Sequence, residues 1–126
     1  MMGFVFRLIP PRHDFRTTMS DQERATMSAH VGYWGELLAQ GRVIAFGPVH
    51  DRARPHGIGI VLAADLAAAE AVRDGDPVMR SLPGFVTEIT PMARLVTAAG
   101  SFDAPSGGAD APDRASSSRV GRGRCR

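Results

Sequence analysis

The fold is decided by residues 20–48, SDQERATMSAHVGYWGELLAQGRVIAFGP. This stretch predicts one long helix followed directly by a strand. Ser20 and Glu23 have the spacing of a capping box, in which each side chain bonds to a free backbone N–H at the start of a helix. The helix is predicted over 21–40, and Gly41 supplies the left-handed residue that commonly ends one. The apolar run RVIAFG then predicts a strand, and the proline after it ends that strand.

The segment before this helix predicts a first strand and a loop. Residues 3–9 alternate, with Phe4, Phe6 and Leu8 on one face, which is typical of a half-buried strand. Two prolines follow and end the strand. We expect a polar loop over 12–19, leading directly into the capping box.

The segment after residue 48 completes the pattern. We expect a strand at 57–62, a short helix at 65–74 and a last strand at 85–90. Between the last two, Asp76 and Pro77 are a typical N-cap and first helical residue. The order β-α-β-β-α-β predicts an α+β fold, the ferredoxin-like βαββαβ sandwich.

Several predicted strands are apolar on both faces, which suggests a partner. In the strand at 42–47, Ile44 and Phe46 face one way while Val43 and Ala45 face the other. Helices can cover only one side of such a sheet, so apolar residues on its other side need a second cover. A second copy of the sheet would supply it, and we therefore expect a symmetric homodimer.

Composition excludes several kinds of chemistry. All fifteen basic residues are arginine, so Schiff-base chemistry and a P-loop, which both need lysine, are excluded. Residues 1–97 carry ten Arg and ten Asp or Glu, so the net charge of +2 comes from 98–126, with five Arg and three Asp. The domain at 1–97 therefore has no basic footprint, and we expect no nucleic-acid partner.

Residues 98–126 form an Arg/Gly/Ser-rich segment that we expect to be a disordered tail. Phe102 and Val120 are its only large apolar residues, too few to offset the entropy cost of ordering. The single cysteine, Cys125, fits a reducing compartment. The apolar runs are too short to span a membrane, and no basic stretch precedes the first of them, as a signal peptide would need. We expect a cytoplasmic protein with no membrane partner.

The order and spacing of several short motifs resemble the YciI-like (YCII-related) family. The motifs are His30 with Tyr33-Trp34 and Leu37-Leu38, the run 41–48, the run 57–60, Asp76-Pro77, and the run 88–92. The resemblance implies a dimeric α/β barrel. It also implies an active site with a His-Asp dyad, on His30 and Asp76 here, and lyase or dehalogenase chemistry on small ring compounds. Many members carry a basic residue three positions before the histidine, where this chain has Met27.

The residues themselves allow two interpretations of each member of the pair. His30 shares the apolar stripe of its helix, so it is either a packed core histidine or a group that transfers protons at neutral pH. Asp76 is either only the cap of a turn or the group that orients His30 and stabilises its imidazolium. The family resemblance favours the catalytic interpretation of both.

Five further residues are candidates for substrate binding. Trp34 and Phe46 could stack on a ring, Gly47 and Pro48 could allow close approach to backbone, and His13 could reach the mouth of a cleft. Other loop residues, His50, Asp51 and His56, match no zinc spacing, so we expect no metal. No motif for another cofactor is present, and we expect none.

The sequence therefore predicts a cofactor-free enzyme that acts on a small cyclic or aromatic molecule by His/Asp acid–base chemistry. Elimination or isomerisation fits best, because neither reaction requires lysine or a nucleotide. The alternative is a non-catalytic module that binds a small ligand or another protein, with His30 as a polar core residue. A haem or metal oxidoreductase has no ligand motif in its favour.

Overall fold

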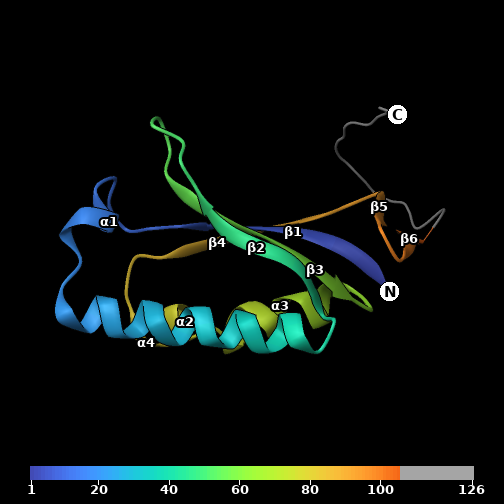
Figure 1. Ribbon diagram of the computed structural model, residues 1–126, viewed down its shortest axis with the longest axis horizontal. Helices are drawn as coiled ribbons and strands as arrows, with labels where there is room; N and C mark the ends of the chain where they lie inside the picture. The colour runs from blue at the N-terminus through green and yellow to red at the C-terminus, as the bar shows by residue number, and fades with distance from the viewer. Residues whose placement is uncertain (106–126) are drawn as a thin grey trace.

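The computed structural model describes residues 1–105 and shows one sheet covered on one face by helices (Figure 1). The four strands are β1 (Met2–Ile9), β2 (Val43–Val49), β3 (His56–Ala63) and β4 (Val86–Pro91). They pair in the order β2-β3-β1-β4, and every neighbouring pair is antiparallel. This is the ferredoxin-like α+β arrangement, and that prediction is confirmed.

The long helix α2 (Asp21–Ala39) begins and ends as its sequence predicts. The Ser20 hydroxyl accepts a bond from the backbone N–H of Glu23 at 3.1 Å, and the Glu23 carboxylate accepts one from the backbone N–H of Ser20 at 2.9 Å. Gly41 has a φ of 76°, the left-handed conformation that other residues adopt at a cost. Helix and strand are therefore separated by a tight turn, which brings β2 back along α2.

The main core lies between α2, α3 (Leu66–Gly75) and the half of the sheet where β1 begins. We call this half the packed end. Its buried residues are Phe4, Phe6, Trp34, Leu37, Val43, Val61, Ala63, Ala69 and Val72. Phe6 and Trp34 meet edge to face with ring centroids 5.6 Å apart, a favoured geometry for aromatic pairs.

The expected polar loop at 12–19 instead contains a short helix, α1 (Phe15–Thr18), and the loop prediction is wrong at this point. The reason is Phe15, the one large aromatic residue in the segment, which is buried. Its ring meets that of Phe85 edge to face at 5.1 Å. Together with Val78 and Leu82 these residues form a second, smaller core cluster near the half of the sheet where β1 ends, which we call the open end.

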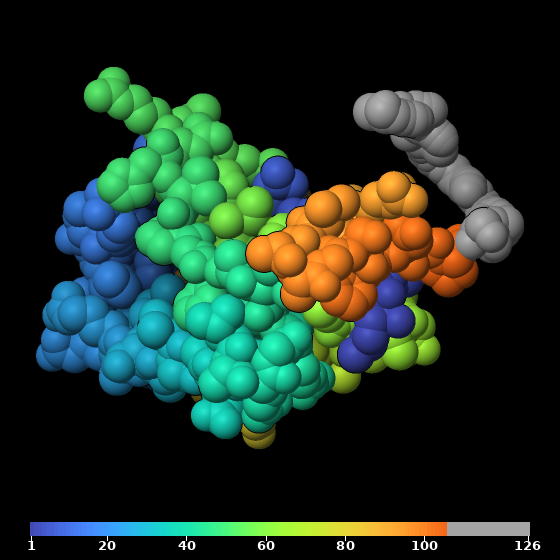
Figure 2. Space-filling model, turned by 45° about the vertical axis from the view of Figure 1, so that its right-hand side comes forward, coloured from blue at the N-terminus to red at the C-terminus, as the bar shows by residue number. Residues whose placement is uncertain are grey.

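Past β4 the chain forms a hairpin whose second strand lies where the sequence predicted the start of a disordered tail. Strand β5 (Arg94–Thr97) pairs with β6 (Gly100–Asp103), and Leu95 of β5 is buried. A Cβ added to Gly3 would lie 2.9 Å from the Leu95 side chain, so the hairpin packs closely on β1. In Figure 2 these residues, in orange, lie against the dark blue start of the chain. The rest of the expected tail, 106–126, lies outside the described residues.

The hairpin covers the helix-free face of the sheet only at the packed end. Farther along that face, Val5 and Ile60 are half-buried and Val86 is 53% exposed. The residues that the structure describes include no helix long and apolar enough to cross a membrane.

Candidate active site

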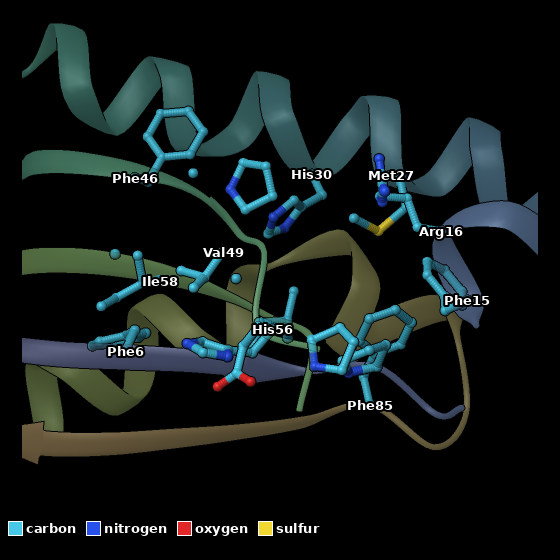
Figure 3. Close-up of a pocket in the computed structure, with 18 of the residues that line it drawn as sticks. Phe6, Phe15, Arg16, Met27, His30, Phe46, Val49, His56, Ile58 and Phe85 are labelled. Carbon is cyan, nitrogen blue, oxygen red and sulfur yellow. The ribbon is translucent and has the colours of Figure 1, made fainter. Parts of the chain in front are cut away.

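A cavity of about 620 Å³ lies at the open end, between the first half of α2 and the sheet. Its floor is formed by Phe6 and Leu8 of β1 with Gly57 and Gly59 of β3. The loop between β2 and β3, the α1 segment and the start of β4 complete its walls. In Figure 3 the ring of His30 reaches from α2 into this space.

The structure places His30 and Asp76 in direct contact. Nδ1 of His30 lies 2.9 Å from Oδ1 and 2.9 Å from Oδ2 of Asp76. His30 comes from the middle of α2, while Asp76 lies at the junction of α3 and α4 (Pro77–Ser81). The two residues are 46 positions apart and meet because both helical segments lie on the same face of the sheet.

Asp76 is the only acidic, basic or polar residue within 1–105 that is buried, with 3% of its surface exposed. Besides His30, its carboxylate accepts bonds from Nε1–H of Trp34 at 2.8 Å and from the backbone N–H of Val78 at 3.1 Å. The second of these is the N-cap bond of α4. Three donors can hold a buried carboxylate in its charged form, which is costly to bury without partners. Asp76 is therefore both the cap that its sequence predicts and the partner of His30.

Trp34 reaches Asp76 because β3 leaves room for its ring. A Cβ on Gly59 would approach Cη2 of Trp34 to 2.8 Å, closer than atoms in contact tolerate. The indole also packs against Phe6 and lies 5.8 Å from the ring of Phe46. The hydrogen bond between Trp34 and Asp76 thus depends on a glycine in the sheet.

The contact with Asp76 determines which ring nitrogen of His30 is free to accept a proton from a bound molecule. A carboxylate only accepts hydrogen bonds, so Nδ1 carries the hydrogen and Nε2 of the neutral ring keeps its lone pair. Within residues 1–105, Nε2 has no hydrogen-bond partner. The side chain is 13% exposed, and the cavity is where that exposed part lies. An imidazole in this arrangement can accept a proton from a bound molecule and return it.

All five residues predicted to bind substrate line the cavity: Trp34, Phe46, Gly47, Pro48 and His13. Phe46 faces the helices beside Trp34, as its register opposite Gly59 requires. His13 lies at the mouth, where its Nε2 donates a bond of 2.7 Å to the backbone carbonyl of Arg52. That bond joins the segment before α1 to the loop between β2 and β3.

Sequence reasoning missed much of the wall on the α1 side. Phe15, Arg16, Ile58 and Phe85 all line the cavity and were not singled out. A large aromatic residue alone in a polar stretch was the available signal for Phe15, since exposing such a ring is unfavourable. For Ile58 and Phe85, the strand pattern predicted that the side chains are buried, but it could not predict that they border the cavity.

An ion pair holds the α1 segment against α2. The guanidinium of Arg12 bonds to both carboxylate oxygens of Glu23, at 2.7 and 3.0 Å, and to the backbone carbonyl of Thr18 at 2.8 Å. The bond from Arg12 holds the pKa of Glu23 at about 2, well below its ordinary value, with a contribution from the Ser20 backbone. On the other side of α2, burial raises the pKa of Tyr33, whose hydroxyl donates to the carbonyl of Val72.

The acidic and histidine side chains near the mouth do not assemble into a cluster. Across residues 1–105, no three His, Cys, Asp or Glu side chains come together in a way that could hold a metal ion. Asp51 instead accepts bonds from the backbone N–H groups of Ala53 and Arg54. His56 contacts the carbonyl of Arg54 through Nδ1 at 2.8 Å and lines the cavity.

Comparison with known proteins places the chain in a family. No curated protein matches it significantly. Among solved structures, it is similar to 5-chloro-2-hydroxyhydroquinone dehydrochlorinase from Burkholderia phenoliruptrix AC1100 in complex with 2,5-dihydroxybenzoquinone. That likeness has a TM-score of 0.48 and 15% identity, over 70% of this chain and 91% of that chain. The model of the YCII-related domain matches residues 4–93, from β1 through β4, which confirms the resemblance inferred from the motifs. The chain therefore belongs to the YCII-related domain family.

Proposed function

We propose that this protein is an enzyme that acts on a small cyclic or aromatic molecule by acid–base chemistry, with His30 as the group that moves the proton. The observation that carries the proposal is the bond between Nδ1 of His30 and Asp76, while Nε2 has no partner among residues 1–105 and lies at a cavity of about 620 Å³. A volume of this size suits a small organic molecule. The aromatic walls, from Phe6, Trp34 and Phe46, suit a ring.

The proposed chemistry uses the two nitrogens of the His30 imidazole differently. Nε2 removes a proton from the bound ring compound, and the buried carboxylate of Asp76 stabilises the resulting imidazolium through Nδ1–H. In an elimination, the electrons of the broken C–H bond form a double bond as the leaving group departs with its own electron pair. In an isomerisation, Nε2 returns the proton to a different carbon. Neither reaction consumes an oxidant or a reductant.

The competing function is a non-catalytic module that binds a small ligand. One observation favours this alternative. Asp76 already has a structural role, because its carboxylate caps α4 and accepts the hydrogen bond from Trp34. Under that alternative, His30 only completes the hydrogen bonds of a buried carboxylate. The two functions predict different effects of a substitution at His30. An enzyme would lose turnover, whereas a binding module would have no turnover to lose.

The test follows proton transfer without assuming the substrate. A panel of hydroxylated, halogenated and unsaturated ring compounds is incubated with the protein in D2O, and proton NMR follows loss of C–H signals while a halide electrode follows halide release. We expect turnover of at least one compound, a loss of about 10²–10⁴-fold in His30→Gln, and a smaller loss in Asp76→Asn.

Ser28→Ala is the matched control, because Ser28 is exposed on the same helix and does not line the cavity. It should behave like the wild type. Equal rates in the wild type and in folded His30→Gln across the panel would reject catalysis by His30 and favour the binding module.

We also propose that the protein is a homodimer, paired through the helix-free face of the sheet. The half-buried Val5 and Ile60 and the exposed Val86 leave an apolar surface there that a second copy would cover. Sedimentation at micromolar concentration should show a dimer, and Ile60→Arg should give a folded monomer. A monomeric wild type would contradict this assembly.

A further inference from the structure

The charged residues around the cavity differ in whether their hydrogen-bonding groups already have partners. Three arginines and three aspartates line it: Arg16, Arg52, Arg73, Asp14, Asp51 and Asp76. Equal numbers would suggest a neutral lining. Within residues 1–105, however, each of the three carboxylates already accepts a hydrogen bond, whereas two of the three guanidinium groups donate none.

Each of the three aspartates already has donors. Asp76 accepts from His30, Trp34 and Val78, as described above. Asp51 accepts from two backbone N–H groups of its own loop. Asp14 accepts a bond from the hydroxyl of Thr18 at 3.4 Å and lies 3.9 Å from Arg12.

The arginines differ from one another in this respect. Arg73 pairs with Asp74 at 2.9 Å. Within residues 1–105, neither Arg16 nor Arg52 has an acidic partner, and both are exposed. Arg16 lies on α1 and is among the side chains drawn around the cavity in Figure 3. Arg52 lies on the loop between β2 and β3, whose carbonyl binds His13, so the two segments that carry these cations meet at the mouth.

We propose that the mouth of the cavity binds the anionic group of a ring compound, a carboxylate or a phenolate, through Arg16 and Arg52. This deepens the proposed function by naming the substrate class, and it rests on the same cavity. The apolar walls receive the ring near His30, while the acidic substituent stays at the mouth, where two guanidinium groups can each offer paired N–H donors.

The test uses two probes of one shape and different charge, benzoate and benzamide. Trp34 is the only tryptophan and lines the cavity, so its fluorescence reports occupation of this site. At low salt we expect benzoate to bind about fivefold more tightly than benzamide, the upper range for exposed ion pairs. The preference should shrink in Arg16→Gln and in Arg52→Gln, vanish in the double variant, and fall as salt is added.

Arg42→Gln is the matched control, because it removes the same charge from an exposed arginine that does not line the cavity. It should keep the full preference for benzoate. Equal affinities for the two probes in the wild type would overturn the inference, and so would a preference that survives in the double variant. Either result leaves the role of His30 to the deuterium-exchange assay, so the two proposals can fail separately.

Discussion

The two ends of the sheet are built from similar strands and differ in how they are covered. At the packed end, α2 and α3 fill one face, and the β5–β6 hairpin places Leu95 on the other. At the open end, the same α2 borders a cavity of about 620 Å³, and the helix-free face has no cover from residues 1–105. The difference separates a closely packed half of one small domain from the half that contains the cavity.

The boundary between the ends is set by two glycines in β3. Gly59 faces the helices and its missing side chain is replaced by the ring of Trp34. Gly57, two residues nearer the open end, also faces the helices, but a Cβ there would meet only ordinary contacts, with Leu8 Cβ at 3.7 Å. The space beside Gly59 is therefore filled by a core side chain, whereas the space beside Gly57 is part of the cavity.

The largest expected effect is from Asp76→Ala, which attacks the junction of the two ends. It leaves the donors on His30, Trp34 and Val78 without their acceptor, and breaking a buried charged network of this kind costs about 3–5 kcal/mol of folding free energy. Urea denaturation measures it. His30→Gln, which keeps the carboxylate and its other donors, should lose much less. Equal losses in the two variants would mean that the pair is chiefly structural.

Gly59→Ala should cost about 1–3 kcal/mol, because its methyl group would overlap the Trp34 ring and force it to move. Trp34 would then lose its bond to Asp76, so its fluorescence should change with the stability. Gly57→Ala is the matched control and should be nearly neutral. If both substitutions proved equally tolerable, the boundary drawn between core and cavity would be in the wrong place.

Removal of the β5–β6 hairpin tests how much the cover on the helix-free face stabilises the packed end. A chain ending at Thr97 lacks β6 and exposes Leu95, which should lower stability by about 1.5 kcal/mol, the lower range for a buried leucine. A chain ending at Pro105 keeps both strands and should melt like the full protein. Thermal denaturation of the two truncations decides it. Identical melting temperatures would show that the hairpin adds nothing to the packed end.

The smallest effect concerns the ion pair at the open end, whose contribution to stability should be lost only in acid. Because the pKa of Glu23 is lowered to about 2 when folded, its contribution to stability is complete above its ordinary pKa of 4.5 and is lost as pH falls toward 2. The difference in melting temperature between the wild type and Glu23→Gln should be constant above that range and shrink below it. A difference that stays constant down to pH 2 would contradict the stated cause.

Local signals in the sequence were enough for the elements of the ferredoxin-like core, because these signals act over a few residues. The Ser20–Glu23 capping box, the turn at Gly41 and the cap at Asp76 each depend on neighbours within one helical turn, and each lies where it was predicted. The apolar alternation that includes Phe4 and Phe6 gave the buried face of β1. From these, the element order and the ferredoxin-like fold followed.

Contacts between distant segments could not be derived in the same way. The polar stretch at 12–19 carries too weak a helical signal, and α1 forms because Phe15 finds Phe85, seventy positions later. The hairpin likewise depends on Leu95 meeting Gly3 across the sheet. The first was predicted as a loop, and of the hairpin only β6 lies in the predicted tail, while β5 had no predicted element, because local composition does not report what a single apolar residue will pack against.

The sequence alone determined the order of the core elements, the buried face of β1 and the identity of His30 and Asp76 as candidates, the last through a family resemblance. It assigned the faces of β2 wrongly, because a bulge between Val43 and Ala45 puts Val43 and Phe46 on the same, helix-covered face. Only the tertiary structure decided that the two side chains touch, that Trp34 shares their carboxylate, and that a cavity adjoins them. The physical reason is that caps and periodicity are properties of neighbouring residues. A cavity is a volume left between elements, and its existence depends on the size of every side chain that faces it.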